Sequence, residues 1–249
     1  MLALISPAKK LLFPSSAPKH THTQPLFKTN TLELITILQE FSKEKLQDLM
    51  GLSDKLAKLN VERFQAFSKN STEKNAQQVI LAFAGDTYQG LKADTFDKQD
   101  LNYAQEHLLI LSGLYGLLRP LDLIQPHRLE MGTKLSTHRG KNLYDFWGSS
   151  LLDFCVKKAK EHRNPTLVFL ASNEYLKVLN VSSKKGLPHV TCHFKEEQNG
   201  TLKTIGLFAK KARGMMARFM LQNRLETPND LKEFQSEGYI FSQRFLTTQ

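Results

Sequence analysis

The sequence has few cysteines and no long apolar run, and these two shortages exclude several classes of protein. The two cysteines among 249 residues, Cys155 and Cys192, cannot build a disulfide framework. So few cysteines are typical of a protein that stays in a reducing compartment. The longest apolar runs, such as residues 79–84 and 167–171, are far shorter than the ~20 residues that span a bilayer. The sequence therefore excludes a membrane protein.

The sequence also lacks the marks of a secreted protein and of the common cofactor enzymes. Residues 1–5 are apolar, but Ser6 and Pro7 follow at once, so the start has neither the basic region nor the apolar core of a signal peptide. We therefore expect a cytoplasmic protein. No Walker loop, dinucleotide-binding glycine fingerprint, nucleophile elbow or paired-histidine zinc motif is present. We expect no cofactor.

One segment, residues 189–193, carries side chains that are typical metal ligands. On a strand, however, His189 and His193 stand about 13 Å apart and Cys192 points to the opposite face. These three side chains do not fit a zinc site. We expect no metal.

Positive charge is in excess. The chain has 34 Lys and Arg against 24 Asp and Glu, which gives a net charge of +10 and an isoelectric point near 9.5. Such an excess favours a polyanionic partner such as nucleic acid, or an anionic small molecule. The imbalance is greatest in residues 201–225, which contain six cations and no acid.

The apolar pattern predicts one mixed α+β domain of the α/β type over residues 1–249, without repeats or linkers. Short apolar runs predict buried strands at residues 2–5, 79–84 and 166–171. Asn199-Gly200 predicts a hairpin between apolar runs at residues 189–194 and 202–208. Helical spacing predicts helices in the remaining apolar segments, over residues 32–50, 53–67, 143–162, 209–224 and much of 86–118.

The segment from Ala209 to Arg224 predicts a helix with a basic face. On a helical wheel its cations fall within an arc of about 160°; they are Lys210, Lys211, Arg213, Arg218 and Arg224. Phe208, Met215 and Phe219 fall on the face expected to be buried. Gly214 falls inside the basic arc, which predicts close approach of a phosphate to the backbone. The alternative is a solvated basic face with a glycine that permits tight packing.

A second pair of glycines predicts a turn between two helices. Gly113 and Gly116 flank Tyr115 and interrupt a leucine stripe, so successive backbone N–H groups could bind one DNA phosphate, as in a helix-hairpin-helix element. Arg119 follows closely. The alternative is an ordinary helix end with a turn.

Charged residues downstream suggest a cleft. Arg128 and Glu130 are two positions apart and point to the same side of an extended segment, near Arg119 and Asp122 in sequence. A carboxylate beside arginines can act as a base while the arginines hold an anion. Lys9 lies just past the first predicted strand, where α/β proteins often place ligand groups. Salt bridges that tether a long loop are an equal alternative for this segment.

Several sequence blocks together resemble the YaaA peroxide stress resistance family. Five blocks occur in the family's order along the whole chain. They are ISPAK from Ile5, SDKLA from Ser53, LSGLYG from Leu111 together with LRPLD from Leu118, RLEMG from Arg128, and AKKARG from Ala209. ASNEY from Ala171 adds a further match. His127 departs from the pattern, because a tyrosine is expected before RLEMG.

The resemblance implies a cytoplasmic protein of the response to hydrogen peroxide that limits iron-driven oxidative damage. It further implies a compact mixed α/β fold that binds duplex or branched DNA through a positively charged cleft and a helix-hairpin-helix element. No catalytic activity is firmly attached to the family. We expect the cleft to be lined by Ser6, Asp122, Arg128, Asn173 and Tyr175.

Two functions remain open at this point. The first is DNA binding through phosphate contacts, whose affinity must fall with salt. The second is an enzyme acting on a nucleotide or on damaged nucleic acid, with Glu130 as general acid or base and Lys9 or Lys210 as nucleophile or charge stabiliser. Direct iron sequestration lacks a ligand cluster in the sequence.

Overall fold

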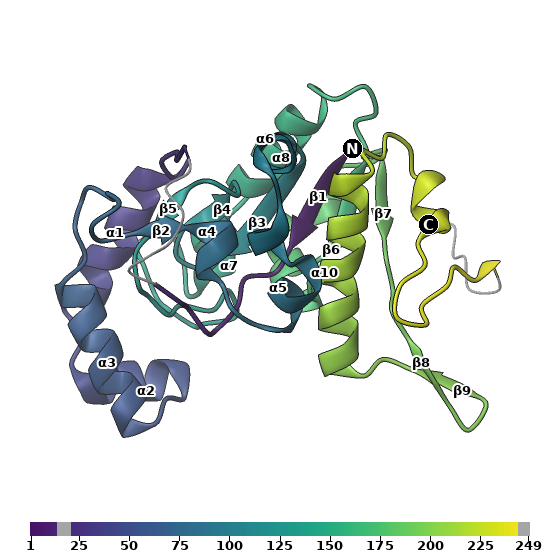
Figure 1. Cartoon of the computed structure of the whole chain (residues 1–249). Helices are drawn as coiled ribbons and strands as arrows, with labels where there is room; N and C mark the ends of the chain where they lie inside the picture. The colour runs from purple at the N-terminus through teal and green to yellow at the C-terminus, as the bar shows by residue number, and fades with distance from the viewer. Residues whose placement is uncertain (14–20, 244–249) are drawn as a thin grey trace.

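A five-stranded sheet forms the centre of the computed structural model, which describes residues 1–13 and 21–243. The strand order is β4-β3-β1-β6-β7, with β1 in the middle (Figure 1). β1 runs parallel to β3 and β6, β6 runs parallel to β7, and only β4 is antiparallel to its neighbour β3. The strands are β1 (Leu2–Ile5), β3 (Leu108–Ser112), β4 (Gly116–Leu118), β6 (Leu167–Leu170) and β7 (His189–Thr191).

The three central strands are buried along their whole length. Ala3 of β1 pairs with Leu108 on one side and Val168 on the other, so the apolar runs lie beside one another. Continuous apolar runs without alternation are what a parallel sheet covered on both faces requires. The predicted strands at residues 2–5 and 166–171 are confirmed.

Helices surround this sheet (Figure 1). α6 (Lys98–His107), α8 (Ser150–Ala159) and α10 (Gly206–Gln222) all contact β1. α1 (Lys28–Gln39), α2 (Lys43–Met50) and α3 (Asp54–Gln65) pack together on the side away from α10. The shorter helices are α4 (Val79–Ala82), α5 (Asp86–Leu91), α7 (Leu143–Trp147) and α9 (Asn173–Leu176), with 3-10 turns at Ala93–Thr95, Lys177–Leu179, Val181–Ser183 and Asp230–Glu233.

Two small ladders complete the secondary structure. β2 (Gln77–Gln78) pairs with β5 (Leu123–Ile124), and β8 (Glu196–Gln198) pairs with β9 (Thr201–Lys203). Asn199 and Gly200 both have positive φ, as a two-residue hairpin turn requires. The hairpin that these residues predict is present but short. Its expected first strand is wrong, because residues 189–191 join the main sheet as β7.

Three predictions of secondary structure are wrong. Residues 79–84 form a single helical turn, α4, and an apolar run of this length does not separate a buried strand from a buried helix. Residues 108–118 form β3, a turn and β4 instead of helix. The helix predicted over residues 143–162 is two helices, because Gly148 adopts a positive φ between α7 and α8.

The fold class is as expected: one compact mixed α/β domain with a largely parallel central sheet. Among the residues that the structure describes, none of the helices combines the length and the apolar character needed to cross a bilayer.

Candidate functional site

The carboxyl edge of the sheet brings together residues that are far apart in sequence. From β1 the chain next enters the sheet at β3 on one side and later at β6 on the other, so β1 lies at a topological switch point. Ser6 follows β1 and Ser172 follows β6. The backbone N–H of Ser172 donates to Ser6 Oγ at 2.8 Å. Open α/β sheets bind ligands just outside the carboxyl ends of strands at such a point.

Three predicted site residues meet beside this edge. Lys9 Nζ lies 2.8 Å from Glu130 Oε2, and Arg128 Nη2 lies 2.9 Å from Glu130 Oε1. The side chain of Lys9 is 65% exposed, whereas those of Glu130 and Arg128 are 26% and 19% exposed. We call Ser6, Lys9, Arg128, Glu130 and Ser172 the carboxyl-edge centre.

The segment that carries Glu130 is fixed to α9. The Glu174 carboxylate accepts a hydrogen bond from the Gly132 N–H at 3.0 Å, and the Tyr144 hydroxyl donates to the Glu174 carbonyl at 3.0 Å. Tyr175 is buried. Its burial, reinforced by the charges of Glu174 and Glu130, raises the pKa of the Tyr175 hydroxyl.

A second buried tyrosine, Tyr88, contacts the backbone of Ser6. The Tyr88 hydroxyl donates to the Ser6 carbonyl at 3.2 Å, which connects α5 to the end of β1. Burial, and to a lesser extent Tyr175, raises the pKa of Tyr88. Both phenols are therefore neutral at physiological pH and can act only as hydrogen-bonding groups there.

Sequence reasoning missed a third cation, Arg63 of α3. Burial lowers the pKa of its guanidinium, and the nearby charge of Arg128 lowers it further. The Arg128 Nε atom is buried and has no hydrogen-bond partner in the described part of the chain. No sequence pattern indicates Arg63, because it lies 65 positions before Arg128 on an ordinary amphipathic helix.

Other predicted site residues lie outside the centre or only at its border. Asn173 is the first residue of α9 and is exposed, next to Ser172. Lys210 is exposed on α10. Their assignment to the site stays a prediction.

The basic face of α10, defined as Lys210, Lys211, Arg213, Arg218 and Arg224, is largely paired within the protein. Lys211 lies 2.6 Å from Glu237, and Arg224 lies 2.7 Å from Asp100. Arg218 donates to the carbonyls of Leu91 and Lys92, at the end of α5, and to Thr95. Burial lowers the pKa of the Arg213 guanidinium. Of the cations predicted to face a groove, Lys211 and Arg218 are therefore paired within the protein, and their part in nucleic-acid binding stays a prediction.

Gly214 is buried, and the prediction that it faces outward is wrong. A Cβ atom at this position would lie 1.8 Å from the Thr87 carbonyl oxygen, and one at Gly90 would lie 2.1 Å from the Lys211 carbonyl oxygen. The two glycines let the backbones of α5 and α10 touch. The close approach that Gly214 permits is therefore to another helix, so no phosphate can reach its backbone.

The apolar face of α10 is also only partly as predicted. Met215 is buried and Phe219 is partly buried, but the Phe208 side chain is 47% exposed and its neighbour Leu207 is 58% exposed. Both exposed residues lie in the first turn of α10.

The predicted helix-hairpin-helix element is not present at residues 108–118. Gly113 and Gly116 form the turn between antiparallel strands β3 and β4. Gly113 packs against the Leu129 carbonyl and Gly116 against the Trp147 ring. Tyr115 is buried, and its hydroxyl accepts a hydrogen bond from the Gln125 N–H. These residues are covered by the protein's own core, so they cannot contact DNA.

Arg119 and Asp122 form a structural tether instead of a cleft wall. Asp122 is fully buried and lies 2.9 Å from Arg119 Nη2. It also accepts hydrogen bonds from the Arg119 N–H and the Thr23 hydroxyl. Arg119 further donates to the Gln24 carbonyl. The pair fixes the segment around Thr23 to the turn before β5.

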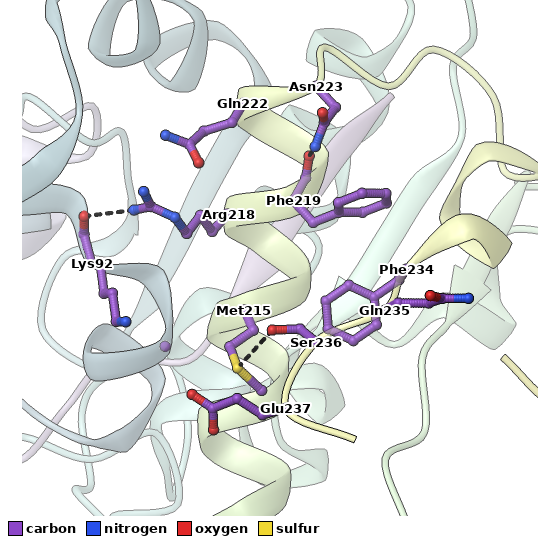
Figure 2. A pocket seen from close by; sticks show the side chains of 11 residues that line it. Lys92, Met215, Arg218, Phe219, Gln222, Asn223, Phe234, Gln235, Ser236 and Glu237 are labelled. Atoms are coloured by element: carbon purple, nitrogen blue, oxygen red, sulfur yellow. Dashed lines mark hydrogen bonds between the residues drawn. The ribbon is translucent and has the colours of Figure 1, made fainter. Parts of the chain in front are cut away.

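A cavity of about 240 Å³ lies between α10 and the C-terminal segment. Met215, Phe219 and Phe234 provide its apolar wall, and Lys92 and Arg218 lie on the opposite side (Figure 2). Arg218 is already engaged by the Lys92 carbonyl (Figure 2). The cavity holds none of the residues of the carboxyl-edge centre.

Within residues 1–13 and 21–243, no three His, Cys, Asp or Glu side chains are grouped as a metal ion would require. Cys155 and Cys192 are both unpaired. Burial raises the pKa of each thiol to about 12, which keeps both cysteines protonated and unreactive.

Comparison with known sequences identifies the family. The sequence model described as peroxide stress protein YaaA matches residues 1–245. The chain belongs to the YaaA family. This membership supports a role in the response to oxidative stress, and it confirms the resemblance that the sequence blocks carry.

Relatives of similar length carry the name UPF0246 protein. A UPF0246 protein of Delftia acidovorans is 50% identical over 247 residues, which cover 97% of this chain and 94% of that protein. A UPF0246 protein of Polaromonas naphthalenivorans is 49% identical over 241 residues, covering 97% and 93%. One of Bordetella pertussis is 46% identical over 241 residues, with the same coverage.

Proposed function

We propose that the protein acts in the peroxide stress response by binding DNA, duplex or branched, through phosphate contacts at the carboxyl-edge centre. The observation that carries this proposal is the pairing of Lys9 and Arg128 with the one carboxylate of Glu130, with the charge of Arg63 acting on Arg128, in a chain of net charge +10. Cations left in excess beside an exposed edge attract a polyanion, and phosphate contacts of this kind do not read base sequence.

Lys210 is the second element of the proposal. It is the member of the basic face of α10 that is exposed, whereas the other four are partly buried. The first half of α10, which carries Lys210, extends past the carboxyl end of β1 (Figure 1), and we expect DNA bound along this edge to reach that half of the helix. Gly214 and the turn from Gly113 to Gly116 have no part in this interface.

The test is a titration of labelled duplex and four-way-junction DNA at several salt concentrations. Affinity is expected to fall linearly on a log–log scale, and Lys9→Ala and Lys210→Ala should each reduce the slope by about one. Lys160→Ala is the matched control. It removes an exposed lysine that follows α8 near the opposite edge, where His107 contacts the Met1 carbonyl. An affinity that does not depend on salt contradicts the proposal.

One observation favours a second function, catalysis on a nucleotide or on damaged nucleic acid. Lys9 lies within hydrogen-bonding distance of a carboxylate that Arg128 orients, which is the arrangement of a nucleophile, its base and a positioning group. Oligonucleotides with abasic or oxidised sites, and free nucleotides, are the substrates to assay. Turnover that Glu130→Gln abolishes and Lys160→Ala leaves intact supports catalysis, and turnover unchanged in Glu130→Gln contradicts it.

A further inference from the structure

We infer that the carboxyl-edge centre binds a phosphate monoester, the terminal phosphate of a DNA end or of a nucleotide, in preference to an internal phosphodiester. This inference deepens the proposed DNA binding and rests on it. An internal phosphodiester carries one negative charge, whereas a monoester carries about −1.5 to −2 near neutral pH. The charges in the centre decide between the two.

The cations of the centre outnumber its carboxylates. Lys9 and Arg128 contribute two positive charges on the two sides of the Glu130 carboxylate, and the charge of Arg63 acts on Arg128 from α3. The Glu174 carboxylate is held by the Gly132 N–H and does not lie between these two cations. An anion that takes the place of Glu130 between Lys9 and Arg128 meets two positive charges, which fits an anion with more than one charge.

Arg128 has unused capacity to donate. It contacts Glu130 through Nη2, and its buried Nε has no acceptor among the described residues. A guanidinium presents several N–H groups in a planar fork that matches the oxygens of a phosphate. Burial strengthens such a contact, because little water competes for the donor.

Glu130 occupies the position where the two cations converge. One carboxylate oxygen contacts Lys9 and the other contacts Arg128, much as two oxygens of a phosphate would. A ligand phosphate must therefore compete with this carboxylate. Removing the charge of Glu130 while keeping its shape is expected to strengthen phosphate binding, whereas a simple loop tether would only lose stability.

The position in the fold agrees with this chemistry. Ser6 and Ser172 follow two adjacent parallel strands at the switch point, where the Ser172 N–H already donates to Ser6 Oγ and the two hydroxyl groups lie 3.4 Å apart. Hydroxyl groups at such an edge can bind phosphate oxygens.

The experiment compares ligands that differ only in a terminal phosphate. Nicked duplexes with a 5′-phosphate or a 5′-hydroxyl at the nick are titrated by fluorescence anisotropy, with dAMP and deoxyadenosine as competitors. The 5′-phosphate duplex should bind about tenfold more tightly than the 5′-hydroxyl duplex. Competition by dAMP but not deoxyadenosine identifies a nucleotide as a sufficient ligand, and preference for the phosphorylated nick without that competition identifies a DNA end.

Variants test whether the centre is responsible. Glu130→Gln should tighten binding of the phosphorylated nick about tenfold without a similar change for the hydroxyl form. Lys9→Ala and Arg128→Lys should abolish the preference, and Lys210→Ala should retain it. Thermal unfolding of each variant shows whether it is folded.

Two results overturn the inference: equal affinity of the wild type for both nicks, or weaker phosphate binding by folded Glu130→Gln. Failure of the proposed DNA binding is distinct, because all duplexes then bind poorly whether or not they carry the phosphate. Competition between dAMP and a labelled nucleotide continues to test the centre in that case.

Discussion

The basic face of α10 and the carboxyl-edge centre both stand out in the sequence by their charge, yet the fold treats them differently. On α10, Lys211, Arg218 and Arg224 are each satisfied by carboxylates or carbonyls from distant segments. In the centre, Lys9 and Arg128 share the single carboxylate of Glu130. Charge density along the chain therefore does not show which cations are available to a partner. Whether a cation is available depends on how many carboxylates and carbonyls of other segments folding brings beside it.

Gly214→Glu tests the packing role of α10 and has the largest expected effect. The new side chain would overlap the α5 backbone, so the variant should lose about 4 kcal/mol or more of unfolding free energy and should largely fail to fold. Gly206→Glu is the control, because no atom lies near a Cβ at that position in the first turn of the same helix. Thermal and urea unfolding measure both. A stable Gly214→Glu protein would restore the outward-facing interpretation.

His127 precedes Arg128, and His127→Tyr tests whether this buried histidine makes the free energy of unfolding depend on pH. Burial lowers the pKa of His127 to about 4, so the folded protein holds it neutral while the unfolded chain protonates it below about 6.5. The free energy of unfolding is therefore highest above about pH 6.5, and it falls by about 3 kcal/mol as the pH falls towards 4.

Tyrosine does not titrate in that range, so His127→Tyr should flatten the fall in stability, measured by urea unfolding between pH 7 and pH 4. Part of the fall remains, because burial also lowers the pKa of His162 to about 4. His193→Gln is the control at an exposed histidine. Equal pH dependence in wild type and His127→Tyr would show that His127 is not held neutral.

Arg218→Ala compares a paired cation of α10 with the exposed Lys210, and its expected effect on stability is smaller than that of the two preceding changes. The variant removes hydrogen bonds to two carbonyls at the end of α5 and to Thr95, and it should cost about 1 to 3 kcal/mol. Lys210→Ala, on the same helix face, should change stability by less than about 0.5 kcal/mol. Chemical denaturation compares the two, and equal effects would mean that Arg218 is as free as Lys210.

Lys9→Ala has the smallest expected effect on stability. An ion pair whose lysine is 65% exposed contributes at most about 1 kcal/mol, because water screens the charges. The same change should nevertheless reduce DNA affinity. A large loss of stability without a loss of affinity would identify the Lys9–Glu130 pair as a tether.

The site could be predicted from the sequence only where its residues were close together or followed a strand. Arg128 and Glu130 are two positions apart in an extended segment, and Lys9 follows β1, so local geometry was sufficient to suggest them. Ser172 and Glu174 reach the same edge from other elements because of the strand order, and Arg63 of α3 comes near Arg128. A single sequence does not state that order.

By itself the sequence determined the mixed α/β class, the adjacent strands β1 and β6 at the switch point and the long helix near the C-terminus, because apolar periodicity is local and directly readable. Only the tertiary structure decided the roles of glycines and cations. Gly214 and Gly113 allow backbone contact equally well with a ligand or with another segment, and an arginine pairs equally well with a phosphate or a carboxylate. Which partner each residue meets depends on segments distant in the chain that folding brings beside it.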